Sequence, residues 1–199
     1  MELKPEVADT LVSTTSIMDW LLHRISAPES DSNRLYASEV LTILLQNSDK
    51  NKRALAERNG IEVVLQAIAR YRKSDPVSAE DEEFLENIFG ALCASAMVKE
   101  NKAMLLKAEA LELMILMMKK RNVARLPAVK VVNFALTDSD DLCAQFVAAL
   151  GLGPVFGFLM GKGLDCTKQK GKERAAEVQE NVISILANLL QRLPAGQKR

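Results

Sequence analysis

Residues 51–68 of the chain read NKRALAERNGIEVVLQAI, and residues 101–118 read NKAMLLKAEALELMILMM. A shift of 50 residues places the second stretch on the first. Self-similarity at a fixed interval is typical of proteins built from stacked structural repeats. The shift pairs identical or similar residues: Asn51 with Asn101, Lys52 with Lys102, Leu55 with Leu105, Ile61 with Leu111, Glu62 with Glu112 and Leu65 with Ile115.

Two further copies flank this pair. Residues 142–159, LCAQFVAALGLGPVFGFL, place Phe146 at the Leu55 position and Gly151 at the Gly60 position. A fainter copy lies upstream, in TTSIMDWLLHRI at residues 14–25. The intervals of 50 and 41 residues bracket the roughly 40–47 residues of helical armadillo and HEAT repeats. The sequence therefore predicts a helical repeat protein.

The unit that begins at Asn51 shows what each repeat contains. A short helix ends at Asn59-Gly60, a pair that readily forms the left-handed turn closing a helix. The next helix, from Ile61 to Ile68, has apolar residues at the i, i+3, i+4, i+7 spacing of one buried face. After the linker SDPVSAED, a longer third helix reads EEFLENIFGALCASAM. Three helices per unit favour armadillo repeats over two-helix HEAT or TPR units.

We therefore predict an all-α fold, an armadillo-like right-handed superhelical solenoid of three-helix repeats. The third helices are expected over residues 33–47, 82–97, 125–137 and 175–193. The predicted organisation is one array over residues 1–193, with a disordered tail at 194–199. The array is divided into a partial unit at 6–47 and units at 51–97, 101–137 and 142–193.

Composition narrows the class of protein. Lysine plus arginine and aspartate plus glutamate number 26 each, which argues against wholesale binding of nucleic acid but not against a local basic patch. The three cysteines are widely spaced without a CxxC pair, as expected of reduced thiols rather than a metal site. The chain shows neither a signal sequence nor a run of 18 apolar residues. These features predict an intracellular protein away from membranes.

The third helices carry a family resemblance. The stretches at 82–96 and AEVQENVISILANLL at 176–190 share an early Glu-Asn and a late leucine-rich end. With NRLYASEVLTILLQNSDKNKRAL at 33–55 and LKAEALELMILMMKKR at 106–121, the chain resembles the beta-catenin-like protein 1 family of armadillo proteins. That resemblance implies a location in the nucleus and a role as a non-enzymatic scaffold of the NineTeen splicing complex. It also implies partners that are splicing factors with basic nuclear-localisation-like segments.

The groove of importin-like armadillo proteins uses a tryptophan, and an asparagine four residues later, on each third helix. The matching pairs here are Glu39/Ile43, Gly90/Ala94, Val129/Asn133 and Ser184/Asn188, so importin-style recognition is not expected. Only Asn133 and Asn188 keep an amide that could hydrogen-bond a peptide backbone. These two amides could equally be buried and satisfied by neighbouring carbonyls.

Acidic residues offer a different groove. Glu39, Glu86 and Glu180, with Arg125 as the fourth rung, occupy comparable places on the expected third helices. Carboxylates along a groove would attract the lysines and arginines of a bound segment. An ordinary solvated face, or helix capping near the helix starts, explains them as well. The predicted peptide-binding residues are Glu39, Glu86, Asn133, Glu180 and Asn188.

Residues 161–174, GKGLDCTKQKGKER, form the longest polar insertion. Its lysines Lys162, Lys168, Lys170 and Lys172 predict either a mobile basic loop or a contact with RNA phosphates that reads no sequence. A third alternative is an architectural or dimerising segment, because uncapped ends of a solenoid leave apolar surface that favours self-association.

Catalytic chemistry finds no support in the sequence. The chain has a single histidine, His23, which is too few for a metal cluster and leaves no conventional catalytic triad. The glycines at 157, 161 and 163 have the wrong spacing for a phosphate-binding loop, and the lysine between them is not followed by serine or threonine. We expect a protein that is not an enzyme and uses no cofactor.

Overall fold

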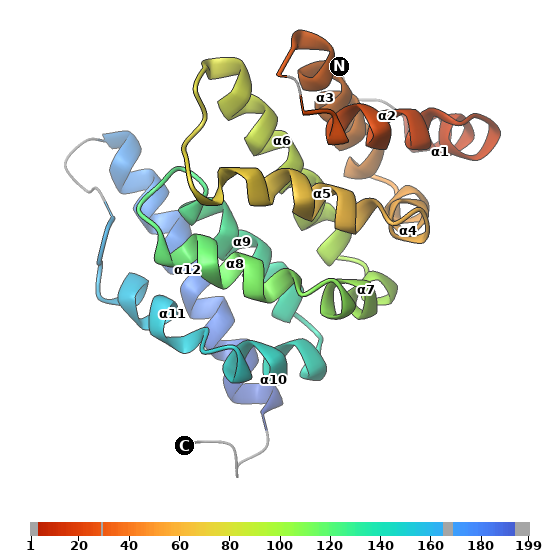
Figure 1. The fold of residues 1–199 in the computed structure, drawn as a ribbon. Coiled ribbons are helices and arrows are strands. Elements are labelled where there is room, and N and C mark those ends of the chain that lie inside the picture. The colour runs from red at the N-terminus through yellow and green to blue at the C-terminus, as the bar shows by residue number, and fades with distance from the viewer. Residues whose placement is uncertain (1–3, 29, 165–168, 194–199) are drawn as a thin grey trace.

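The computed structural model describes residues 4–28, 30–164 and 169–193, and in this part of the chain every regular element is a helix. Figure 1 shows the helices stacked in chain order. Four successive groups of three form the units: α1 (Pro5–Thr14), α2 (Ile17–Ser26), α3 (Ser32–Gln46); α4 (Asp49–Glu57), α5 (Gly60–Ala69), α6 (Ala79–Ala96); α7 (Lys102–Lys107), α8 (Ala110–Lys119), α9 (Arg125–Leu136); α10 (Asp140–Ala148), α11 (Leu152–Leu159), α12 (Gln169–Arg192).

Equivalent helices of successive units pack against each other. The third helices α3, α6, α9 and α12 contact one another in that order, and the second helices α2, α5, α8 and α11 form a parallel row. A short 3-10 helix, η1 (Arg70–Arg72), extends α5, and another, η2 (Lys99–Asn101), precedes α7. The prediction of an all-helical armadillo-type solenoid is confirmed.

The joint between the first and second helices has the same backbone conformation in three units. Asn59, Glu109 and Leu150 are left-handed, with φ values of 55°, 53° and 62°. The residue after Leu150 is Gly151, and a Cβ there would lie 2.4 Å from ring atoms of Phe146. Glycine at this place therefore lets the second helix start against the side chain of the first helix.

The repeated asparagine of the sequence holds the end of the preceding third helix. The amide of Asn51 donates to the Leu44 carbonyl in the last turn of α3 (2.9 Å). The amide of Asn101 donates to the Ser95 carbonyl in the last turn of α6 (3.2 Å) and to the Lys52 carbonyl (2.9 Å). Because the last carbonyls of a helix lack partners within it, each buried asparagine links one unit to the next.

The structure differs from the predicted boundaries at two places. The first unit, expected as partial, contains three helices, α1 to α3. The last third helix, expected from residue 175, begins at Gln169, because the run from Lys172 to Glu177 consists of good helix formers. The predicted disordered tail at 194–199 lies outside the described residues.

No single described helix is long and apolar enough to cross a membrane; α10 and α11 would reach the required length only together, and they are bent by 88°. Within the described ranges, histidine, cysteine and carboxylate side chains nowhere gather in a group of three that could hold a metal ion.

Candidate functional site

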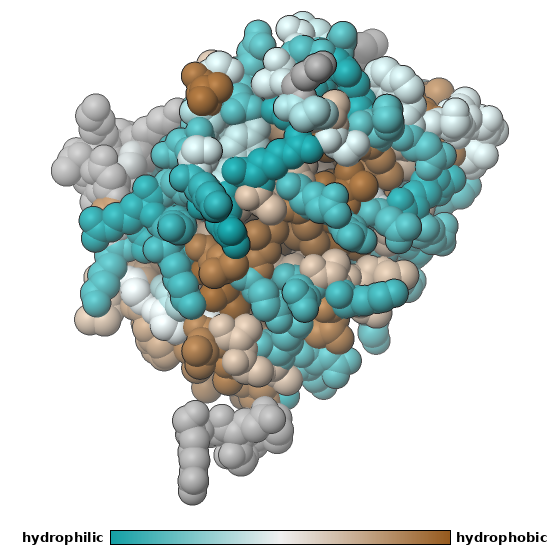
Figure 2. All heavy atoms as spheres, in the orientation of Figure 1, coloured by the Kyte–Doolittle hydropathy of each residue, from teal (hydrophilic) through white to brown (hydrophobic). Residues whose placement is uncertain are grey.

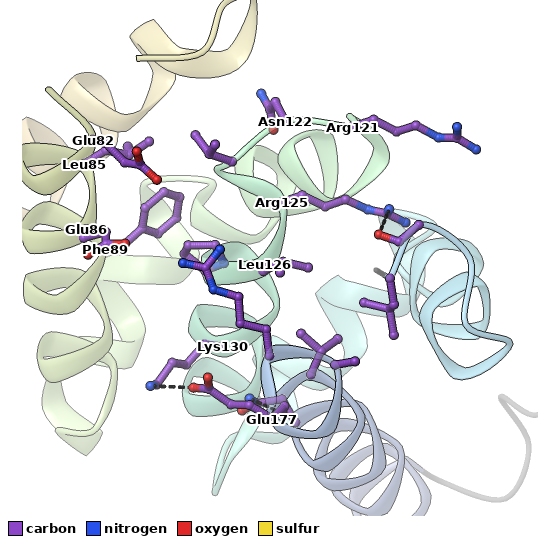
Figure 3. Close-up of a pocket in the computed structure, with 18 of the residues that line it drawn as sticks. Glu82, Leu85, Glu86, Phe89, Arg121, Asn122, Arg125, Leu126, Lys130 and Glu177 are labelled. Atoms are coloured by element: carbon purple, nitrogen blue, oxygen red, sulfur yellow. Dashed lines mark hydrogen bonds and ion pairs between the residues drawn. The ribbon is translucent and has the colours of Figure 1, made fainter. Parts of the chain in front are cut away.

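A groove of about 1080 Å³ opens between α6 and α12, above the start of α9. Helix α9 has 12 residues, whereas α6 has 18 and α12 has 24. The first turns of α6 and α12 therefore extend beyond α9 and form two walls, as Figure 3 shows. The turn of residues 121–124, which precedes α9, closes one end of the groove.

The floor of the groove is apolar. Leu85 and Phe89 of α6 and Val178 of α12 are each less than 5% exposed, and Leu126 of α9 lies between them. Cys93 also lies in this floor, and burial raises the pKa of its thiol to about 12. The thiol therefore stays protonated at neutral pH, and the floor offers contact area for apolar side chains rather than a nucleophile.

The α6 wall is acidic. Glu82 and Glu86, one helical turn apart, are exposed and line the groove. Figure 3 places both carboxylates on the groove side of α6. Neither of them forms an ion pair with any residue that the structure describes. This wall therefore presents two unneutralised negative charges beside an apolar floor.

The opposite side is closer to neutral. Lys130 of α9 and Glu177 of α12 form an ion pair with an Nζ–Oε1 distance of 2.9 Å, and this hydrogen bond raises the pKa of Lys130. Figure 3 shows the pair across the base of the groove. Arg174 of α12 lines the same side and is exposed. The groove thus has one acidic wall and one wall of mixed charge.

Arg125, the fourth predicted rung, has a structural role. Its Nε donates to the Met118 carbonyl (3.1 Å) and its Nη2 to the Lys162 carbonyl (2.9 Å). Its guanidinium carbon lies 4.2 Å from the centroid of the Phe158 ring. Burial is the main cause of a lowered pKa for Arg125. The side chain joins the start of α9 to the end of α11, although its edge still borders the groove.

Only one of the five predicted peptide-binding residues, Glu86, lines this groove. Glu39 on α3 is half-buried, and Glu180 on α12 is exposed, outside the lining. The amide of Asn133 donates to Asn181 (2.9 Å), which joins α9 to α12. The amide of Asn188 donates to the Ser184 carbonyl one turn earlier (3.0 Å). A peptide-binding role for these four residues stays a prediction.

The basic stretch has a different form from the predicted loop. Lys162 is exposed between α11 and α12, while Lys172 is exposed in the first turns of α12. Lys170 belongs to the same helix, and the structure does not describe its side chain. Lys168 lies outside the described residues.

Sequence reasoning missed Glu82, Lys130 and Glu177. The signal for Glu82 was available, since a residue four positions before Glu86 shares its helical face. The Lys130–Glu177 pair spans 47 positions, and no local pattern indicates it. Two of the positions that match the importin tryptophan also lie in different surroundings: Val129 is fully buried, whereas Gly90 lines the groove.

Comparison with known proteins extends these observations. The sequence model of the family described as "Catenin-beta-like, Arm-motif containing nuclear" matches residues 1–199. The chain is 40% identical to beta-catenin-like protein 1 of Mus musculus and 39% identical to that of Homo sapiens, in each case over 100% of the chain and 35% of the relative. It is 35% identical to the homologue of Schizosaccharomyces pombe, over 95% of the chain and 32% of that protein.

A solved engineered protein has the same fold, with a TM-score of 0.72 at 16% identity over 95% of this chain and 41% of that one. The chain spans about a third of the length of the curated relatives it matches. The match to the family covers every unit of the solenoid, including the helices that form the groove. The chain therefore belongs to the catenin-beta-like family of Arm-motif-containing nuclear proteins.

Proposed function

We propose that this chain is a non-enzymatic protein-binding scaffold whose groove, between α6 and α12, holds a basic segment of another protein. The observation that carries the proposal is the α6 wall, where Glu82 and Glu86 stand exposed beside an apolar floor. A segment with lysine or arginine on one side and apolar residues beneath would be complementary to both surfaces.

The chemistry of the lining supports binding over catalysis. The described lining residues include no histidine, serine or threonine, and the Cys93 thiol has a pKa of about 12. Nucleophilic catalysis needs an activated nucleophile beside a base. The groove instead combines four carboxylates, four cationic side chains, two amides and an apolar floor, which is the composition expected of a surface that recognises a peptide with both charged and apolar side chains.

The biological setting is part of the same proposal. The family is described as nuclear, and the resemblance of the third helices implies work in pre-mRNA splicing, with basic segments of splicing factors as the ligands. Because the chain spans about a third of its relatives, the splicing role is proposed for the protein to which these units belong. In that protein, this chain would supply the groove that binds the basic segment.

The test is fluorescence anisotropy with a labelled 12-residue peptide that alternates Lys-Arg pairs with leucine. The double variant Glu82→Lys/Glu86→Lys reverses the acidic wall. We expect it to weaken binding at least about tenfold, the equivalent of about 1.4 kcal/mol. The matched control is Glu6→Lys/Glu57→Lys, which makes the same change of net charge at exposed residues of α1 and α4, outside the lining of the groove.

The control separates a local effect from a general one. We expect the control variant to bind within about threefold of the wild type, because exposed charges more than about 10 Å apart are largely screened near 0.1 M salt. Equal losses in both double variants would show that only net charge matters. Unchanged binding in both double variants would show that the acidic wall of the groove does not contribute to peptide binding.

A further inference from the structure

In the second, third and fourth units, basic residues gather around the connection from the second helix to the third helix. The segments 70–75, 119–124, 160–164 and 171–174 contain nine lysines and arginines and two acidic residues, Asp75 and Glu173, in a chain whose net charge is zero. In Figure 1 these connections lie along one edge of the solenoid, and Figure 2 shows hydrophilic side chains over this side. Positive charge is therefore concentrated on one edge.

Hydrogen bonds hold the successive connections beside one another. The amide of Asn122 donates to the Tyr71 carbonyl (3.1 Å), and the Val123 N–H donates to the Asp75 carboxylate (3.0 Å). Arg125 then reaches the carbonyls of Lys162 (2.9 Å) and Gly163 (3.3 Å). Three units thus share one continuous edge with a fixed backbone.

The cations on this edge are free to meet a ligand. We define the basic edge as Arg72, Lys73, Lys119, Lys120, Arg121 and Lys162. All six are exposed, and none forms an ion pair within the described part of the chain. In Figure 3 the guanidinium of Arg121 points away from α6 and its carboxylates.

Acidic residues offset part of the positive charge at the first connection. Asp75 accepts a hydrogen bond from the Val123 N–H and keeps its negative charge, whereas the carboxylates of Glu82 and Glu86 lie on the groove side of α6. Glu80 and Glu83, also in the first turns of α6, are exposed next to the first connection. The positive charge is therefore greatest around Lys119, Lys120, Arg121 and Lys162, where Arg121 also disfavours the charge on Arg125.

We propose that the basic edge binds the phosphate backbone of a single-stranded nucleic acid. Cations spread over three units match a ligand with regularly repeated negative charge. Tyr71, the aromatic residue of these connections, is 6% exposed and cannot stack on a base, so the contact would be to phosphates and independent of sequence. An acidic peptide would gain specificity from apolar anchors, for which Val123 and Met160 are exposed in these segments; such a peptide is the alternative occupant that the test distinguishes.

The test measures anisotropy of a fluorescein-labelled oligouridylate of 12 nucleotides against the full chain at 25 to 200 mM NaCl. For single strands, the logarithm of the binding constant falls with the logarithm of salt by about 0.7 per phosphate contacted. We expect Lys119→Gln/Lys120→Gln/Arg121→Gln to reduce that slope by about 2 and to weaken binding at low salt. The matched control, Lys50→Gln/Lys99→Gln/Lys107→Gln, removes three exposed charges from other segments.

The proposal is supported if the control variant keeps the salt dependence of the wild type while the edge variant shows a slope smaller by about 2. A slope near zero for the wild type, or equal losses in both variants, would overturn it. Tighter binding of a polyglutamate peptide of equal charge would also overturn it, in favour of an acidic protein segment. The Glu82→Lys/Glu86→Lys variant should bind the oligouridylate at least as well as the wild type, so this proposal and that of the peptide groove succeed or fail separately.

Discussion

Arg34 of α3 and Asp81 of α6 form a buried ion pair, with an Nη2–Oδ1 distance of 2.8 Å and side chains that are 4% and 8% exposed. Tyr71 donates its hydroxyl proton to the same carboxylate, and the Arg34 guanidinium lies 4.0 Å from the centroid of the Phe84 ring. The residues come from the first and second units, so this cluster fixes how one unit packs on the next.

The first prediction concerns removal of one partner. Asp81→Ala leaves the Arg34 guanidinium buried without its counter-ion, so the free energy of unfolding should fall by about 3–5 kcal/mol. Urea unfolding followed by circular dichroism measures the change. Asp140→Ala is the control: Asp140 pairs with Arg192 but is 73% exposed, and its loss should cost no more than about 1 kcal/mol. Similar losses in the two variants would contradict the role assigned to burial.

A second prediction follows from Tyr71. Burial, helped by the hydrogen bond to Asp81, raises the pKa of Tyr71 to about 12. As the pH rises above 10, the unfolded chain loses this proton before the folded chain does, so stability that is complete below pH 10 should decline up to pH 12. The expected slope is about 1.4 kcal/mol per pH unit.

The measurement for Tyr71 is the urea midpoint between pH 8 and 11.5. Tyr71→Phe should flatten the alkaline decline, because the titrating group is gone. Tyr36→Phe serves as the control, since Tyr36 is 58% exposed and lies outside the cluster. A decline of equal slope in the wild type and Tyr71→Phe would show that other groups cause it.

The third prediction concerns the joint of the last unit. A Cβ atom at position 151 would lie 2.4 Å from the ring of Phe146, which is fully buried. The methyl group of Gly151→Ala would therefore clash with this ring, and we expect the free energy of unfolding to fall by about 1–3 kcal/mol. The third unit has Ala110 at this position, opposite Leu105 instead of a ring. Thermal unfolding checks the effect against Gly157→Ala.

Gly157 is a suitable control because it lies inside α11 and a Cβ there would meet nothing within 4 Å. Alanine in a helix interior is favoured over glycine by up to about 1 kcal/mol, so Gly157→Ala should stabilise the protein. If both alanine variants moved the melting temperature in the same direction, contact with Phe146 would not be the cause.

The fourth prediction concerns Lys102, which is 7% exposed on α7. Its Nζ donates to the carbonyls of Phe134 (2.9 Å) and Ala135 (3.1 Å), and also to that of Thr137, at the end of α9. Lys102→Met keeps the aliphatic stem but leaves these acceptors without the donor. We expect the free energy of unfolding to fall by about 2–3 kcal/mol.

Lys107→Met, at the exposed end of the same helix, is the matched control and should change stability by no more than about 0.5 kcal/mol. Chemical denaturation at constant pH distinguishes the two. Equal stability of both variants would mean that the hydrogen bonds from Lys102 do not stabilise the C-terminal end of α9.

Local pattern was enough to predict the fold. Residues 51–68 and 101–118 repeat at a fixed interval, and their apolar spacing, turn residues and helix formers all favour the same three-helix unit. Residues 59, 109 and 150 occupy the same place in the aligned repeats, and all three have the left-handed backbone conformation. The family resemblance was carried by residues 33–55, 82–96, 106–121 and 176–190, which belong to the same repeat units.

The site was decided by tertiary structure. Periodicity shows which residues share a face of one helix, but not how that helix is rotated or displaced relative to its neighbours. Glu39, Glu86 and Glu180 occupy comparable sequence positions, yet only Glu86 lines the groove. The reason is that the groove exists where α6 and α12 extend beyond the shorter α9, a relationship between three helices that are distant in sequence. The basic edge likewise depends on hydrogen bonds between connections about 50 residues apart, such as that from Asn122 to Tyr71.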